Sequence, residues 1–217
     1  MVSTREQRLE EKLMSAGTFL AVMITSTLLC GSAEACKGSN VLLEDKFEKA
    51  DPAWDSDLNI AGGKARLTAA RGEAWVVLYE ATEFANIDYC ADVTLPTDVD
   101  AESWGGLAFW AVDVDSYYAY WMDGTGALEV GRLRSGKWLT PVKKRRVPQI
   151  EVLPGSTHTM RVTLQGNMAT LYLDDRKPVD FTGQPPRGES FIGVAAESPE
   201  DRKISWTFSR LKVTSFP

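Results

Sequence analysis

The 217-residue sequence predicts an all-β fold, a two-sheet antiparallel jelly-roll sandwich. Short runs rich in β-branched and aromatic residues recur at fairly regular spacing after residue 60, with turn-forming residues such as Gly166 and Asn167 between them. No segment after residue 35 shows a sustained helical period. Roughly 180 residues can bury one full core, and no Ser/Gly-rich or Pro-rich linker divides them. We therefore expect a single domain at residues 36–217.

The first 35 residues have the pattern of a signal peptide. Three basic residues precede an apolar run at residues 19–29, which ends near Ala33 and Ala35. The run fits the roughly 7–15 residues of a signal h-region and is shorter than the ~20 that span a bilayer. We expect cleavage after Ala35 and a secreted or periplasmic protein without a transmembrane span. An uncleaved anchor and a precursor lipidated on Cys36 are the alternatives.

Cleavage after Ala35 would leave only two thiols, those of Cys36 and Cys90. Two cysteines in an oxidising compartment usually pair. We therefore expect a Cys36–Cys90 disulfide with a structural role, closing a loop of about 55 residues and contributing on the order of 4 kcal/mol. Two unpaired, buried cysteines are the alternative.

Strands are expected where apolar and β-branched residues alternate or run together between turn formers. Turns are expected at residues 61–64, 135–136, 165–167 and 174–175. The expected strands cover residues 65–69, 74–79, 89–95, 105–112, 117–122, 128–133, 159–164, 169–173, 191–196 and 204–213.

The segments at 105–112 and 117–122 form a predicted hairpin, and five of its residues are Trp or Tyr. Successive side chains of a strand point to opposite faces. We expect Phe109 and Met122 to face the core, which leaves Trp110, Tyr117 and Trp121 for the other surface. Rings exposed there could stack on the flat C–H face of a sugar. The alternative is that they only cover the sheet or pack under a loop.

The charge balance argues against nucleic acid as a partner. The chain carries 24 basic and 30 acidic residues; without residues 1–35 the numbers are 21 and 26, a net charge of −5. Phosphate binding needs clustered Lys and Arg, and the only such cluster lies at 143–146. We interpret it as a solvated edge strand or loop, where lysine also blocks edge-to-edge pairing.

A series of short motifs runs in one order over most of the chain after residue 36. The motifs are LEDKF at 43–47, GGKARL at 62–67, GLAFW at 106–110, GKW at 136–138, IGV at 192–194 and WTFSRLKV at 206–213. Together they resemble the concanavalin A-like (laminin-G-like) jelly rolls, and within them the bacterial domains related to the 3-keto-disaccharide hydrolase group. The resemblance implies two curved sheets with a carbohydrate groove on the concave face of one.

In such a groove Trp110, Tyr117 and Trp121 would be the ligand-binding rings. Arg132 or Glu129 from the following strand would supply polar partners for sugar hydroxyls, but not both if they lie on opposite faces. Trp138, at the end of a loop, would be a platform at the rim, or would only pin that loop.

The sequence contains no recognisable catalytic constellation. Its single histidine, His158, is expected at the surface or in a turn, and its isolation excludes most nucleophile–histidine and histidine-rich metal sites. A glycosidase needs only two carboxylates. The family 16 glycoside hydrolases of this fold carry Glu-x-Asp-x-Glu, and the nearest match, residues 98–102, begins with Asp. No cofactor or metal is predicted, with calcium on acids such as Asp45 as the open alternative.

These observations favour a secreted or periplasmic, non-catalytic carbohydrate-binding protein whose partner is a glycan or a glycan-bearing surface. One alternative is a glycoside-processing enzyme of the 3-keto-disaccharide hydrolase type, although WGGL stands at 104–107 where those domains have Asn-Ser-Gly-Ile. The other is an envelope protein-interaction domain. Facing carboxylates in the groove would favour the enzyme, exposed rings without them the binding protein, and a flat apolar patch the interaction domain.

Overall fold

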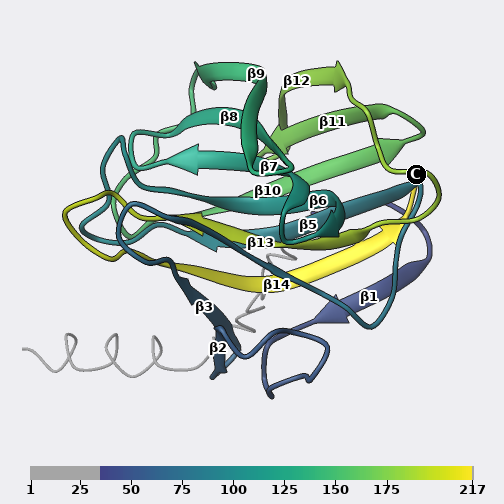
Figure 1. Cartoon of the computed structure of the whole chain (residues 1–217), viewed down its shortest axis with the longest axis horizontal. Helices are drawn as coiled ribbons and strands as arrows, with labels where there is room; N and C mark the ends of the chain where they lie inside the picture. The colour runs from purple at the N-terminus through teal and green to yellow at the C-terminus, as the bar shows by residue number, and fades with distance from the viewer. Residues whose placement is uncertain (1–34, 217) are drawn as a thin grey trace, which may run out of the picture. The chain divides into compact units, whose positions relative to one another are not determined.

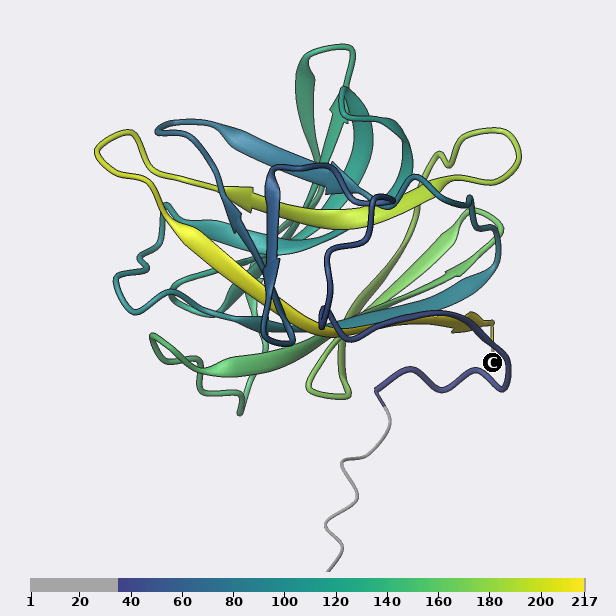
Figure 2. The same cartoon turned by 90° about the horizontal axis from the view of Figure 1, so that it is seen from below.

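The computed structural model describes residues 35–216, which form two antiparallel β-sheets packed face to face (Figures 1 and 2). In chain order the strands are β1 (Val41–Asp45), β2 (Leu58–Ala61), β3 (Lys64–Thr68), β4 (Ala74–Leu78), β5 (Ile87–Thr94), β6 (Trp104–Asp113), β7 (Ser116–Asp123), β8 (Ala127–Arg134), β9 (Lys137–Arg146), β10 (Thr157–Gln165), β11 (Met168–Leu173), β12 (Arg176–Thr182), β13 (Phe191–Glu197) and β14 (Ser205–Ser215). The predicted all-β antiparallel sandwich is confirmed. Within residues 35–216 no helix is long and apolar enough to cross a membrane.

The two sheets differ in size and strand order. The eight-stranded sheet has the order β12-β11-β10-β5-β14-β3-β2, and β1 pairs with β14. The six-stranded sheet has the order β4-β13-β6-β7-β8-β9. Neighbours in space such as β5 and β14 are far apart in sequence, because the chain crosses repeatedly between the sheets.

Every predicted strand segment is a strand in the structure. Strands β1, β2 and β12 were not predicted, and of β9 only residues 143–146 were interpreted as an edge strand or loop. Strands β2, β9 and β12 lie at sheet edges, where charged residues and proline are tolerated and the apolar pattern is weak. The basic segment at 143–146 belongs to β9 and is exposed, as expected for a solvated edge strand.

The core lies between the sheets. Phe109 and Met122 of the six-stranded sheet are fully buried there, as predicted, against large side chains of the eight-stranded sheet such as Trp206 and Phe208. The hydroxyl of Tyr89 in β5 crosses the core and donates a 2.7 Å hydrogen bond to the carbonyl of Gly193 in β13. Packing in the core therefore fixes the position of β13 and of the hairpin of β6 and β7. The side chains on the outer face of the same strands are fixed with them.

The predicted disulfide between Cys36 and Cys90 is confirmed. It ties the segment before β1 to the middle of β5, one of the central strands of the eight-stranded sheet. The predicted signal peptide, except for Ala35, lies outside the described residues.

Candidate functional site

A bulge in β6 changes the direction of Trp110. The pairing of β6 with β7 shifts between Phe109 and Asp113, and Trp110 has a positive φ of 49°. As a result Trp110 turns inward beside Phe109, while Ala111 takes the outer face. The Trp110 ring packs edge-on against Tyr118 with 5.3 Å between centroids. The prediction that Trp110 faces the outer surface is therefore wrong.

Tyr117 and Trp121 do lie on the outer face of the six-stranded sheet, as the alternation predicts. Both are nearly buried, because Trp138 from the edge strand β9 packs against them with ring centroids 5.8 Å and 6.2 Å away. Trp138 itself is 45% exposed. Trp138 is therefore the most accessible of these three rings, and Trp121 lies below it.

The outer face is hollowed next to these rings into a cavity of about 210 Å³, here called the tryptophan pocket. It is lined by Trp104, Trp121, Glu129, Gly131, Trp138, Leu139, Thr140 and Glu197. Five strands contribute, because the register places Trp121 between Gly106 of β6 and Glu129 of β8, and Trp104 beside Glu197 of β13. The cavity is smaller than the ~300 Å³ of typical drug-sized clefts and suits a single sugar residue.

Gly131 forms part of the pocket floor and has no side chain for a steric reason. A Cβ at this position would lie 2.8 Å from the Trp138 ring and 2.9 Å from Nε1 of Trp121. The glycine therefore lets both indoles close over the backbone of β8. This requirement depends on the pairing of three strands, so the sequence pattern gave no sign of it.

Glu129 and Glu197 face the same pocket, and folding raises the pKa of both carboxyls. For Glu197 the causes are burial first and then the charge of Glu129. For Glu129 they are burial and the charge of Asp123, opposed by Lys144 and by the hydrogen bond from its backbone N–H. Neither carboxylate forms an ion pair with another residue of 35–216. Glu129 was a sequence candidate, whereas Glu197 was not.

The raised pKa of Glu197 predicts a pH-dependent stability change in E197Q. A carboxyl that holds its proton more tightly when folded costs stability once it ionises, so the cost is present above its folded pKa and absent below its unfolded pKa of about 4.3. We expect E197Q to melt at a higher temperature than the parent at pH 8, because it removes that cost, and at the same temperature below about pH 4. Thermal unfolding followed by circular dichroism checks this, with the exposed Glu83→Gln as control. A gain that persists at pH 4 would contradict it.

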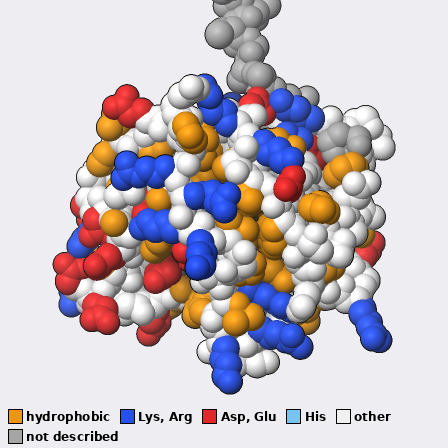
Figure 3. Space-filling view, turned by 90° about the horizontal axis from the view of Figure 1, so that it is seen from above, with side chains coloured by type: hydrophobic (Ala, Val, Ile, Leu, Met, Phe, Trp, Pro, Cys, Tyr) orange, Lys and Arg blue, Asp and Glu red, His pale blue; other side chains and the backbone are white. Residues whose placement is uncertain are grey.

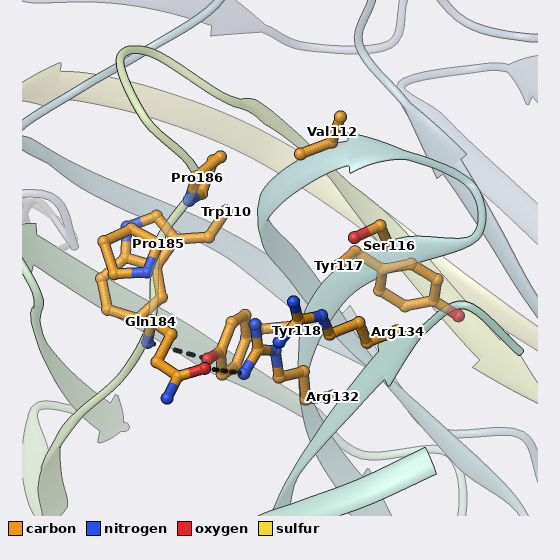
Figure 4. Close-up of a pocket in the computed structure, with 10 residues that line it drawn as sticks. All are labelled: Trp110, Val112, Ser116, Tyr117, Tyr118, Arg132, Arg134, Gln184, Pro185 and Pro186. Carbon is orange, nitrogen blue, oxygen red and sulfur yellow. Dashed lines mark hydrogen bonds between the residues drawn. The ribbon is translucent and has the colours of Figure 1, made fainter. Parts of the chain in front are cut away.

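A second cavity of about 270 Å³, here called the arginine pocket, lies beyond Tyr117. It is lined by Trp110, Val112, Ser116, Tyr117, Tyr118, Arg132, Arg134, Gln184, Pro185 and Pro186. The Arg132 guanidinium lies 5.0 Å from the centroid of the Tyr118 ring and donates a 2.7 Å hydrogen bond to Gln184 Oε1. The backbone N–H of Gln184 donates in turn to the Tyr118 hydroxyl (Figure 4). Arg132 and Glu129 line different pockets, so they do not serve one site together.

The five predicted ligand-binding residues thus divide between two pockets. Trp110, Tyr117 and Arg132 line the arginine pocket, and Trp121 and Trp138 line the tryptophan pocket. The contact between Tyr117 and Trp138 joins the two groups. On the side of the molecule that carries β9 and β12, Lys and Arg side chains gather near hydrophobic ones, while most of the visible Asp and Glu side chains lie along one edge (Figures 1 and 3).

His158 is not a surface or turn residue, so that prediction is wrong. It is 7% exposed in β10, and its ring nitrogens lie 2.7 Å from Asp174 Oδ2 and 2.8 Å from Ser156 Oγ. The order Ser–His–Asp is that of a hydrolase triad. Here, however, both the hydroxyl and the backbone N–H of Ser156 donate to the carbonyl of Leu153, at 2.6 Å and 2.9 Å. The Ser156 hydroxyl, which would be the nucleophile, and the Ser156 N–H, which could stabilise an oxyanion, are therefore both used within a turn. We assign the hydrogen bonds between Ser156, His158 and Asp174 a structural role.

The remaining acidic candidates also have structural partners. Residues 98–102 lie in the loop between β5 and β6, where Asp100 binds Arg202. Asp45 accepts hydrogen bonds from the backbone N–H of Phe47 and from Trp54 Nε1. In the part of the chain that the structure describes, no three His, Cys, Asp or Glu side chains are grouped so that they could hold a metal ion.

Comparison with known proteins identifies the fold. No protein-family model and no curated protein matches the chain. Among solved structures, the carbohydrate-binding module CBM66 from Bacillus subtilis is 17% identical with a TM-score of 0.56, covering 70% of this chain and 86% of that one. A Bacillus licheniformis beta-glucanase is 10% identical with a TM-score of 0.60, covering 82% and 100%.

A Bacteroides ovatus GH16 protein in complex with a G4G4G3G product is 13% identical with a TM-score of 0.59, covering 80% of this chain and 100% of that one. At these identities the likeness defines the fold. The chain has the concanavalin A-like jelly-roll fold, as the motif order indicated. The predicted relation to the 3-keto-disaccharide hydrolase group stays a prediction.

Proposed function

We propose that this chain is a secreted or periplasmic carbohydrate-binding protein that holds a glycan on the outer face of the six-stranded sheet. The observation that carries the proposal is the exposed Trp138 ring above a pocket lined by Trp121 and two carboxylates. A sugar offers apolar C–H groups to an aromatic ring and hydroxyls to acceptors at its edge. The Cys36–Cys90 disulfide supports an oxidising compartment.

The likeness to a carbohydrate-binding module and to glucanases adds support, because those proteins use the same fold in carbohydrate chemistry. An interaction domain is less well supported. The face expected to be a flat apolar patch is instead interrupted by a cavity that contains Glu129 and Glu197.

Replacing Trp138 by Ala is expected to weaken glycan binding by about 30-fold, since truncating an exposed aromatic anchor at a binding surface costs about 2 kcal/mol. W138F should keep most of the affinity because it keeps a ring. The measurement is a glycan-array screen of the full chain, exported so that its disulfide forms, followed by titration of the best ligand.

The matched control is Met168→Ala, which removes another exposed apolar side chain, from β11 of the other sheet. Unchanged affinity in a folded W138A protein would overturn the proposed binding surface. Absence of any glycan ligand on the array would overturn the proposed function itself.

A second candidate, glycoside hydrolysis, is favoured by one observation, the two carboxylates facing one pocket. Glu129 and Glu197 lie on strands separated by β7 and β6 and are offset by two residues along them, so their backbones are about 16 Å apart in a flat sheet. Side chains reaching inward from both sides would approach the roughly 5–10 Å that glycosidases need. Sugar release in the same array wells, lost in both E129Q and E197Q, would establish hydrolysis; binding without release would exclude it for those glycans.

A further inference from the structure

The tryptophan pocket is negatively charged. Glu129 and Glu197 line it without a cationic partner among residues 35–216. Beside them Asp123 is fully buried, and the Lys144 ammonium lies 2.5 Å from its Oδ2. The single cation of this group is thus paired with the one carboxylate that does not line the pocket. Two negative charges remain next to the cavity.

The pocket walls also favour a cation. The face of an indole ring carries negative potential and attracts ammonium groups within about 6 Å. One ring of the pocket already does so, because the Lys144 ammonium lies 4.7 Å from the Trp104 ring centroid. Trp121 and Trp138 are the other two indoles that line the cavity, and within residues 35–216 neither holds a Lys or Arg over its ring.

A hydrogen-bond donor opens into the same cavity. Trp121 is 4% exposed, and its indole N–H makes no hydrogen bond within residues 35–216. Its Nε1 lies over Gly131, at the pocket floor, 2.9 Å from where a Cβ would stand. Because this N–H donates to no other described group, an acceptor on a ligand in the cavity can take its hydrogen bond. The ligand therefore needs an oxygen acceptor as well as a positive charge and an apolar face.

We propose that the tryptophan pocket binds a cationic amino sugar, with its ammonium between Glu129 and Glu197, its ring against Trp138 and one oxygen accepting from the Trp121 N–H. This inference rests on the proposed function and names the ligand class of that site. A neutral sugar would leave both carboxylates without an ion-pair partner, and an acidic sugar would be repelled. An ammonium in the cavity would offset the charge of both carboxylates.

The test uses three β-1,4-linked hexamers that differ only at C2: glucosamine with an ammonium, N-acetylglucosamine with an acetamide, and glucose with a hydroxyl. Each is titrated calorimetrically into the full chain at pH 6.5 and low salt. We expect the glucosamine hexamer to bind at least about tenfold more tightly than the other two. The preference should fall in E129Q and in E197Q, disappear in the double variant, and remain in the exposed control Glu83→Gln.

Equal affinity for the three hexamers, or a preference that survives in the double variant, would overturn the inference. So would oligolysine binding as tightly as the glucosamine hexamer and equally in W138A, because charge alone would then explain binding. If the array identifies other glycan ligands but no amino sugar binds, the inference fails while the proposed function stands. If no glycan binds at all, both fail.

Discussion

Replacing Asp88 by Asn is expected to lower the free energy of unfolding by about 3–5 kcal/mol, the cost of leaving a buried charge without its partner. Asp88 is fully buried in β5, and its two oxygens accept hydrogen bonds of 2.7 Å and 2.9 Å from Nε and Nη2 of Arg161 in β10. The backbone N–H of Lys37 also donates to it, at 2.7 Å. An Asn side chain cannot neutralise the guanidinium, which is itself largely buried over the Tyr172 ring.

Urea unfolding of D88N against the parent measures this effect. The matched control is Asp175→Asn, because Asp175 also pairs with Lys37, through its ammonium at 2.9 Å, but both side chains are about half exposed. Exposed pairs contribute about 0–1 kcal/mol. A D88N protein no less stable than D175N would contradict the prediction. The double variant D88L/R161M should recover much of the loss, since an apolar pair of similar size needs no counter-charge.

Replacing Cys36 and Cys90 together by Ala is expected to cost about 4 kcal/mol, because the disulfide closes a loop with a sequence separation of 54. The polar contacts of the segment before β1 are few. The backbone N–H groups of Lys37 and Gly38 donate to Asp88 and Thr214, Asn40 exchanges hydrogen bonds with Ser215, and Lys37 forms the exposed ion pair with Asp175. Without the covalent bond, these contacts alone must offset the conformational entropy that the segment loses when it becomes ordered. Urea unfolding of the oxidised parent, of the reduced parent and of the Ala variant should place the last two together, well below the first.

The two effects should not add. Both act on the segment that carries Cys36 and Lys37, so the loss of the disulfide weakens the Lys37 hydrogen bond to Asp88 as well. A double-mutant cycle is expected to show coupling above about 0.5 kcal/mol. Simple additivity would show that the two interactions stabilise separate regions. An Ala variant as stable as the oxidised parent would contradict the role assigned to the disulfide.

Strands of the sandwich interior could be predicted because their signal is local. In β6 and β7 the alternation identified Phe109 and Met122 as core residues, and both are buried. The edge strands β9 and β12 carry no such signal, since charged residues and Pro178 interrupt their apolar pattern. Their pairing depends on neighbours that the local sequence does not reveal.

The candidate site was predictable only in part. Tyr117 and Trp121 were correctly expected on the outer face of the sheet, because period-two alternation holds along β7. The role of Trp138 as a platform at the rim stays a prediction. Trp110 was misplaced, since a bulge shifts the register by a local change of backbone angle that the residue types do not specify. Glu197 was missed because it reaches the pocket through its pairing with Trp104, a contact between distant parts of the chain.

The amino-acid sequence by itself determined the all-β class, the disulfide and the existence of an aromatic sheet face, because each follows from local alternation or from residue type. Only the tertiary structure decided which rings are accessible and which charges they meet. Trp138 of the edge strand β9 covers Trp121, and the position of β13 places Glu197 in the same pocket as Glu129. Such placements depend on strand order across the sheet, which is set by the packing of the whole core rather than by any one segment.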